Sequence, residues 1–261
     1  MKPVAIACLL VALPAPAPAA AEEPDPLRVG TFNIDRDRGL DAWRRAVVAF
    51  RRGVDVGGLQ EVSGPVKRGF LADRRWGAYG RGEDPVMWDR RDFRGTGGRS
   101  VRIAPASYAT VARLRHRATG APYAVVNVHL VWGTTQAVQR LRLAQVRGLA
   151  RAAADERATG ARVLVVGDFN VDHAVDRRSR RPGLPVRRLG AVGLVAAWDV
   201  RDRLPRAEGS STLGAGYIDQ VWSTPPALRV RAWQHVSGGQ HHPVVAAYAV
   251  RRPTGRQHPA E

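Results

Sequence analysis

The chain has 261 residues, an apolar fraction of 44% and a formal net charge of +18 at pH 7. A chain of this length can bury a large core within one domain, and this apolar fraction excludes wholesale disorder. The charge favours polyanionic partners such as nucleic acid, anionic membrane surfaces or phosphorylated substrates, although the arginine bias of the chain can also reflect genome composition.

Residues 1–21 have the features of a secretory signal peptide. Lys2 supplies a positive charge, an apolar run extends from Val4 to Leu13, and three alanines ending at Ala21 precede two glutamates. The run is shorter than the roughly 20 residues that a membrane span requires, and the prolines that follow it would break a spanning helix. We therefore expect cleavage near Ala21 rather than an uncleaved anchor, and a soluble, secreted protein with no stable membrane insertion.

Cys8 is the only cysteine, and it lies inside this predicted signal peptide. A lipid-attachment cysteine is the alternative, but almost no apolar run precedes Cys8. The mature chain would then contain no cysteine, which excludes disulfide bonds, thiolate metal sites and cysteine nucleophiles.

The first part of the mature chain predicts a strand, a helix and a second strand. After a short linker at residues 22–26, residues 27–34 alternate apolar and polar side chains as a half-buried strand does. We expect Asp41 to cap a helix that has one apolar face and ends at Gly53, and residues 54–59 to form the next strand. This order indicates α/β layering.

The rest of the chain predicts strands separated by loops and by one long helix. Residues 63–85 are expected to form loops and a short helix, residues 136–156 the longest helix, and the basic residues 176–188 a surface loop. Further strands are expected at residues 86–89, 101–103, 108–115, 123–130, 162–166, 217–222 and 244–250. Residues 251–261 are expected to be a disordered tail. No internal repeat or long linker divides the sequence, so residues 27–250 are predicted to form one domain.

Polar side chains stand where several predicted strands end. The set consists of Asn33, Glu61, His129, Asp168, Asn170, Asp219 and His241. Strand ends of a rigid sheet can bring such side chains to one cleft. Carboxylate and amide oxygens suit Mg²⁺, Mn²⁺ or Ca²⁺, while a histidine near a carboxylate suits acid–base chemistry near neutral pH. The set predicts metal-assisted phosphoryl hydrolysis, and no Gly-x-Ser-x-Gly, Walker-type or His-Glu-x-x-His motif points elsewhere.

Each of these residues also has a structural interpretation. Asn33 would bond a neighbouring backbone group, Glu61 would be a solvated carboxylate, and His129 would be a core histidine. Asp219 is costly to bury inside an apolar strand without a partner, which favours a paired role. The Gly167-Asp168-Phe169-Asn170 element is the most specific, because two polar side chains bracket an apolar one directly after a β-branched strand.

The order and spacing of these motifs resemble the endonuclease/exonuclease/phosphatase superfamily, which includes deoxyribonuclease-I-like nucleases, bacterial sphingomyelinases and inositol-polyphosphate phosphatases. The resemblance covers residues 27–250 and rests on Thr31-Phe32-Asn33-Ile34, Gln60-Glu61-Val62, Asn127-Val128-His129-Leu130, Gly167-Asp168-Phe169-Asn170, Ile218-Asp219 and His241-His242-Pro243-Val244. It implies an α/β fold, a four-layer α/β sandwich of two packed β-sheets flanked by helices.

The resemblance also implies roles for the polar residues. Glu61 would be the principal ligand of a divalent cation, first of all Mg²⁺, with Asn33 close by as a second ligand. Asp168 and Asn170 would orient the attacking water and the phosphate. A weaker Arg-x-x-Gln pattern in the long helix, at Arg142 and Gln145, is expected to be structural.

The histidines complete the implied site. His241, oriented by Asp219, would hold the scissile phosphate or act as base, and His129 would donate a hydrogen bond or a proton on the phosphate side. The superfamily pattern Asp-His-x-Pro has an aspartate directly before this histidine, whereas the present chain has Gln240. Gln240 supplies no negative charge, which weakens any metal contact from that position. His242 is the alternative working residue, although the His-x-Pro spacing favours His241.

The leading hypothesis is a secreted, metal-dependent phosphodiesterase that acts as a nuclease on DNA or RNA by in-line attack of water. The arginine-rich residues 177–188 would contact phosphates. One alternative is a sphingomyelinase-like phospholipid phosphodiesterase or a phosphomonoesterase. A sphingomyelinase-like enzyme would be expected to have an exposed aromatic hairpin that enters the membrane. No clear segment of this kind stands out, but Trp76, Tyr79 and Trp88 are the candidates for it. A further alternative is a non-catalytic cationic binding protein that retains the fold, which Gln240 alone favours. No protein partner is inferred, and we expect a monomer.

Overall fold

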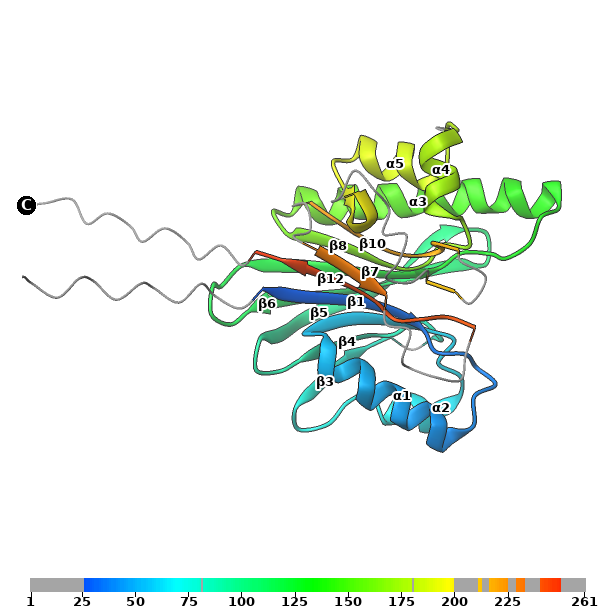
Figure 1. The fold of residues 1–261 in the computed structure, drawn as a ribbon. Helices are drawn as coiled ribbons and strands as arrows, with labels where there is room; N and C mark the ends of the chain where they lie inside the picture. The colour runs from blue at the N-terminus through cyan, green and yellow to red at the C-terminus, as the bar shows by residue number, and fades with distance from the viewer. Residues whose placement is uncertain are drawn as a thin grey trace, which may run out of the picture.

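Two β-sheets pack face to face, and helices cover the outer face of each sheet (Figure 1). The computed structural model describes residues 26–80, 82–179, 181–199, 211–212, 216–224, 229–232 and 240–249. The predicted signal peptide at residues 1–21, the linker up to residue 25 and the tail at residues 251–261 lie outside the described residues. The layers confirm the predicted four-layer α/β sandwich.

Within the described part of the chain, each sheet has six strands and contains one parallel pair at its centre. In the first sheet the order is β11 (Arg229–Ala232), β12 (Val244–Tyr248), β1 (Leu27–Asn33), β2 (Val56–Gln60), β4 (Val86–Asp89) and β3 (Trp76–Tyr79), with β1 parallel to β2. In the second sheet the order is β5 (Phe93–Ala104), β6 (Ser107–His116), β7 (Pro122–His129), β8 (Arg162–Asp168), β10 (Asp219–Ser223) and β9 (Val195–Ala196), with β7 parallel to β8. The remaining neighbours in both sheets are antiparallel.

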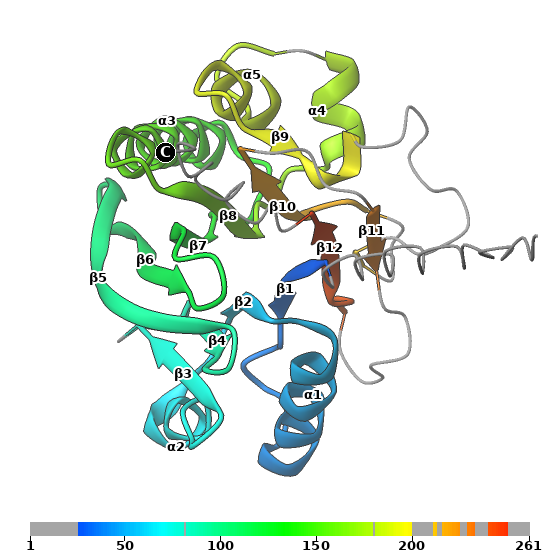
Figure 2. The ribbon, with the colours of Figure 1, turned by 90° about the vertical axis from the view of Figure 1, so that its left-hand side faces the viewer.

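The helices divide between the two outer faces. Helices α1 (Leu40–Gly53) and α2 (Gly64–Gly69) lie outside the first sheet, and α3 (Gln136–Ala158), α4 (His173–Ser179) and α5 (Pro185–Ala191) lie outside the second (Figure 2). A short 3-10 helix, η1 (Ala197–Asp199), follows β9. Among the residues described, no helix has the length and apolar composition that crossing a bilayer requires.

The alternation of side chains along the central strands decides which residues reach the site. In β1, Val29 packs in the core between the sheets, whereas Phe32 packs against α1 on the outer face. In β7, Val125 faces the other sheet, while Val126 packs among residues of α3. Because side chains alternate with a period of two, Asn33 and His129 continue the inner faces of their strands. The inner face therefore changes from apolar to polar at the carboxyl ends of these strands.

A buried polar network joins the two sheets just below this edge. The Gln60 Nε2 group donates to Asn127 Oδ1 at 2.6 Å, and Asn127 Nδ2 donates to the carbonyl oxygens of Leu59 and Pro85 at 2.8 and 2.9 Å. A Cβ atom on Gly58 would collide with the Asn127 side chain, so this close approach requires glycine. The bonds satisfy two buried amides that would otherwise be costly to desolvate.

The prediction that residues 176–188 form a surface loop is wrong, because this range contains the end of α4 and the start of α5. The basic composition conceals an apolar side, on which Leu189 is fully buried. Pro185 occupies the first turn of α5, where a missing amide hydrogen costs nothing. The Asp176 carboxylate accepts a hydrogen bond from the Val186 amide at 2.8 Å and so ties the two helices together.

Three smaller expectations also require correction. Residues 63–85 contain the strand β3 as well as the short helix, and the strand predicted at residues 101–103 begins at Phe93. Glycines in β5 weaken its strand signal, but Gly95 and Gly98 lie against the rings of Trp88 and Tyr79, where any larger side chain would collide. Helix α1 begins at Leu40, so Asp41 lies in its first turn and is not the cap.

Candidate active site

Strand register brings the predicted site residues to one edge of the sandwich. Asn33 is level with Gln60 in the parallel pair β1–β2, so that Glu61 follows directly beyond the edge of the sheet. His129 is level with Asp168 in the parallel pair β7–β8, and Asp219 is paired with Asp168 from the antiparallel strand β10. Residues from five separate chain segments therefore meet where parallel strands end.

These residues surround an open pocket of about 940 Å³. Six of the seven predicted residues line it, namely Asn33, Glu61, His129, Asp168, Asn170 and His241. The seventh, Asp219, is fully buried behind His241. The volume lies within the range of small-molecule sites and would accommodate a nucleotide.

Asn33 links two carboxylates from opposite sheets. Its Nδ2 group donates to Glu61 Oε1 at 3.0 Å and to Asp168 Oδ2 at 3.1 Å, while its Oδ1 atom accepts from the Asp35 amide at 3.1 Å. The amide nitrogen thus faces the two acids and the oxygen faces the backbone. Asn33 holds Glu61 and Asp168 in place, and its role as a metal ligand stays a prediction.

Glu61 is held as a carboxylate. Burial works against its charge, but hydrogen bonds from Asn33 and from the Arg36 amide, together with the charges of His129 and Arg36, keep its pKa below the usual value. The backbone at Glu61 has φ of 63°, in the left-handed region that residues other than glycine rarely occupy. This conformation turns the chain sharply after β2 and directs the acid into the pocket.

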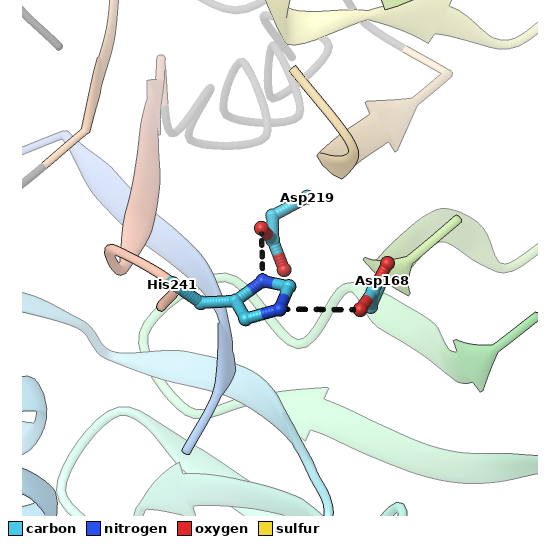
Figure 3. A group of neighbouring side chains, drawn as sticks. All are labelled: Asp168, Asp219 and His241. Atoms are coloured by element: carbon cyan, nitrogen blue, oxygen red, sulfur yellow. Dashed lines mark hydrogen bonds and ion pairs between the residues drawn. The ribbon is translucent and has the colours of Figure 1, made fainter. Parts of the chain in front are cut away.

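His241 lies between two aspartates (Figure 3). Its Nδ1 atom is 2.8 Å from Asp219 Oδ2, and its Nε2 atom is 3.8 Å from Asp168 Oδ2. Burial alone would lower the pKa of His241, but Asp219, Asp168 and Glu61 raise it to about 9. Burial and the neighbouring Asp168 raise the pKa of Asp219. The ring of His241 is therefore a cation near neutral pH, with its Nε2 side toward the pocket.

His129 and Asn170 also approach the Asp168 carboxylate. His129 Nε2 is 3.6 Å from Asp168 Oδ2, and the Asn170 amide donates to Asp168 Oδ1 at 2.9 Å. The Asn170 side chain donates to the Leu130 carbonyl at 2.9 Å, and its backbone has φ of 47°. Asp168 is thus the centre of the site, because Asn33, His129, Asn170 and His241 all converge on its carboxylate.

Sequence reasoning missed two charged residues at this site. Asp84 precedes β4, and one of its carboxylate oxygens, Oδ1, is buried without a hydrogen-bond partner among the described residues. Burial raises the pKa of Asp84 to about 6, and the charge of His129 opposes this effect. Arg36 lines the pocket and bonds both Glu61 and Glu83. Neither Asp84 nor Arg36 ends a strand, so the sequence pattern gives no signal for them. They come close to the other site residues only because the loops at this edge of the sandwich pack together.

The weak Arg-x-x-Gln pattern has the structural role expected from the sequence. Arg142 donates to the carbonyl oxygens of Val131 and Gly133 at 3.0 and 2.7 Å, and Gln145 Oε1 accepts from the Val131 amide at 3.0 Å. Both residues lie on α3. They fix the segment that leads from His129 to the helix.

Asp219 contacts the side chain of His241 and not that of His242. The side chain of His242 is buried, its backbone amide donates to the Ser211 carbonyl at 2.8 Å, and burial lowers its pKa. Gln240, in the position where the superfamily pattern has aspartate, is exposed and lines the pocket. Because the side chain of Gln240 is a neutral amide, the negative charge next to His241 comes from Asp219 and Asp168.

The donor set of the pocket suits a hard divalent cation. The carboxylates of Glu61 and Asp168 both approach Asn33, and Asp168, Asp219 and His241 offer ligand atoms that lie within 4.8 Å of one another. Asp84 adds a further acid next to Glu61, outside the residues that line the pocket. The chain as a whole has a net charge of +18, yet these carboxylates concentrate negative charge at one place, and a bound cation would neutralise it. Oxygen-rich sites of this kind favour Mg²⁺, Mn²⁺ or Ca²⁺.

Comparison with known proteins gives a family match over most of the chain. The model described as "Endonuclease/Exonuclease/phosphatase family" matches residues 30–242. A sequence search among curated proteins found no match.

Several solved structures share the fold. The human Nocturnin catalytic domain with bound sulfate is 18% identical, with 86% of this chain and 95% of that chain covered and a TM-score of 0.63. TDP2 from D. rerio, complexed with a single-strand DNA product, is 14% identical, with 85% and 98% covered and a TM-score of 0.61. A mannosyl-6-phosphatase from Bacteroides thetaiotaomicron is 13% identical, with 84% and 98% covered and a TM-score of 0.62. At these identities the similarity establishes the fold alone.

Proposed function

The chain belongs to the endonuclease/exonuclease/phosphatase family, and on this premise we propose that it is a secreted, metal-dependent phosphodiesterase that cleaves nucleic acid. One observation carries the proposal. A histidine held between two aspartates converges with further carboxylates in one pocket of a strongly basic chain. The acids suit a divalent cation, the histidine suits a phosphate, and the overall charge suits a polyanion.

Glu61 and Asp168 would hold the cation, with Asn33 orienting both carboxylates. Mg²⁺ is the ion we favour, with Mn²⁺ or Ca²⁺ as alternatives. A divalent cation at this position polarises a phosphoryl oxygen and offsets the charge that develops during displacement.

The histidines would act on the substrate. His241, charged near neutral pH and held by Asp219 through Nδ1, would donate a hydrogen bond from Nε2 to the scissile phosphate. Asp168 would accept a hydrogen bond from the attacking water, and Asn170 would complete the contacts of the phosphate. His129, whose Nε2 atom is 3.6 Å from Asp168 Oδ2, would donate a hydrogen bond or a proton on the leaving side. The buried Asp219 keeps the ring of His241 in one orientation, as in other His–Asp pairs.

Nucleic acid is favoured over a membrane lipid by the placement of the aromatic residues. Trp76 and Trp88 are buried, and Tyr79 packs on the core between the sheets. They therefore do not form the exposed hairpin that membrane entry would require. Among proteins of this fold, TDP2 has been solved with a single-strand DNA product, which supports a nucleic-acid substrate for this pocket. The fold is also shared with a mannosyl-6-phosphatase, so a phosphomonoester is included among the substrates to be tested.

Secretion is proposed from the sequence of residues 1–21, with its apolar run and alanine-rich end. Expression of the full chain in a secreting host, followed by determination of the N-terminal residue of the exported protein, tests this part. Export with a new N-terminus near residue 22 is expected. Retention of the intact N-terminus at the membrane would contradict it.

A substrate panel tests the activity. Purified protein is assayed on plasmid DNA, single-stranded RNA, sphingomyelin vesicles, a chromogenic phosphodiester and a chromogenic phosphomonoester, each with Mg²⁺ and with EDTA. The Glu61→Ala variant, purified in parallel, controls for contaminating nucleases. We expect EDTA-sensitive cleavage of DNA or RNA that the variant lacks. Cleavage of only the phosphomonoester or only sphingomyelin would replace the proposed substrate, and no EDTA-sensitive cleavage at all would favour a binding protein that keeps the fold.

A further inference from the structure

Trp132 is the most exposed large apolar side chain among the described residues. It is 80% exposed, compared with 60% for Val66, the next in order. Trp132 also lines the pocket, three residues beyond His129. Single exposed apolar side chains are common on protein surfaces, so it is the place of Trp132 in the lining of the pocket, together with its exposure, that points to a ligand.

The backbone around Trp132 is fixed on both sides. Before it, the Leu130 amide donates to the Asp168 carbonyl at 2.9 Å, and the Val131 amide donates to the buried side chain of Gln145 at 3.0 Å. After it, Arg142 donates to the Gly133 carbonyl at 2.7 Å. The exposure of the indole is therefore a property of a well-bonded segment. These bonds fix its position relative to Asp168, the centre of the site.

We propose that Trp132 is a stacking platform for a nucleobase next to the scissile phosphate. The inference rests on the proposed function and names a specificity-determining residue for it. Every base has a flat π-face, so stacking on an indole recognises single-stranded nucleic acid with little sequence preference. Arg36, whose half-exposed side chain pairs with Glu61 and Glu83, lines the same pocket and would offer its remaining guanidinium N–H groups to the backbone that carries the base.

A lipid would need a different surface. Insertion into a membrane requires several neighbouring apolar side chains, whereas the other exposed large apolar residues of the described part belong to separate elements: Leu40 and Val48 on α1, Val66 on α2, Tyr108 on β6, Val175 on α4 and Val195 on β9. The pocket around Trp132 instead offers Arg36, Thr212 and Gln240. A single aromatic ring within a polar and charged surround suits a base and its phosphate.

The test compares Trp132→Ala and Trp132→Phe with the wild-type enzyme on two strands of equal length. One is a single-stranded oligonucleotide, and the other has the same phosphates but abasic residues throughout. We expect Trp132→Ala to raise KM for the base-containing strand about tenfold, as loss of one base–aromatic stack does, with kcat nearly unchanged. Trp132→Phe should retain most of the affinity, and neither variant should change KM for the abasic strand. Val66→Ala, an exposed apolar truncation on α2, serves as the matched control.

Three outcomes would overturn the inference. An unchanged KM of Trp132→Ala for the base-containing strand would remove the stacking role. An equal rise of KM for both strands would show that Trp132 supports the segment and does not bind a base. A defect of Trp132→Ala confined to sphingomyelin vesicles would assign the indole to a lipid surface. Failure of the wild-type enzyme to cleave either strand is a separate result, which would refute the proposed substrate and the inference with it.

Discussion

The Asp219–His241 pair allows a sharp prediction for the variant Asp219→Asn. The wild-type pKa of His241 is raised to about 9, and Asp219 is the strongest of the groups that raise it. Relative to the ordinary value of about 6.5, this amounts to about 3 kcal/mol in favour of the charged ring. Asparagine keeps the shape and one hydrogen bond but removes the charge, while the burial of the ring remains. We expect the pKa of His241 to fall below about 7 in the variant, so that the ring is mostly neutral at pH 7.5.

NMR titration of the His241 ring, in the presence of EDTA so that no cation competes, measures this pKa directly. A matched control exists within the same chain, because His173 Nε2 lies 2.9 Å from Asp199 Oδ1 in a second His–Asp pair outside the pocket. Asp199→Asn should leave the titration of His241 unchanged. A His241 midpoint that stays near 9 in Asp219→Asn would refute the reasoning, since the charge would then come from elsewhere.

The same pair links pH to stability. A histidine whose pKa is raised in the folded state stabilises the fold below its unfolded pKa, and this contribution is lost as the pH rises through the folded value. The free energy of unfolding of the wild-type protein should therefore fall by up to about 3 kcal/mol between pH 6.5 and 9 through His241. Urea unfolding across this range should show the loss in the wild type and a flatter profile in Asp219→Asn. Equal profiles would contradict the assignment.

Three further predictions concern the site and the sheets below it. Glu61→Ala and His241→Ala should each lower turnover at least ~100-fold, and wild-type rates in both would refute the site as drawn. Cleavage of single-stranded nucleic acid at low substrate concentration should fall at least about tenfold between 50 and 200 mM salt, as three or more phosphate contacts require; a flat response in rate assays would indicate a small or neutral substrate. Asn127→Ala should lower the free energy of unfolding by about 2–3 kcal/mol, because it removes the bond from Gln60 and the bonds that Asn127 donates to the buried Leu59 and Pro85 carbonyls; a urea midpoint like that of the wild type would contradict this.

Much of the site could be predicted because it follows strand periodicity. Asn33, His129 and Asp168 each end a strand whose inner face is otherwise largely apolar, and the sequence displays that change directly. Parallel pairing then brings the ends together without further information. Asp219 was expected to have a partner because an acid is costly to bury inside an apolar strand, and His241 stands just before the last predicted strand, where the family resemblance favoured it over His242.

The missed features depend on contacts that sequence periodicity does not encode. Asp84 lies next to Glu61 because the segment before β4 pairs with the segment around Glu61, through the Leu59 amide to the Pro85 carbonyl and the Val62 amide to the Glu83 carbonyl. Helix α5 was hidden by Pro182, Gly183 and Pro185, which indicate a loop, and β5 by its glycines, because in both cases tertiary packing outweighs local propensity. Such elements become visible only once their partners are placed.

The left-handed backbone at Glu61 and Asn170 has a consequence for engineering this protein. Both residues hold conformations that cost a side-chain-bearing residue of order 1 kcal/mol or more. Glycine at either position would relieve that strain and remove a functional group in the same step. Selection of thermostable variants without an activity screen should therefore accumulate substitutions at these two positions, and the stabilised proteins should be the inactive ones. In this protein a trade-off between stability and activity is thus expected at two residues that line the pocket.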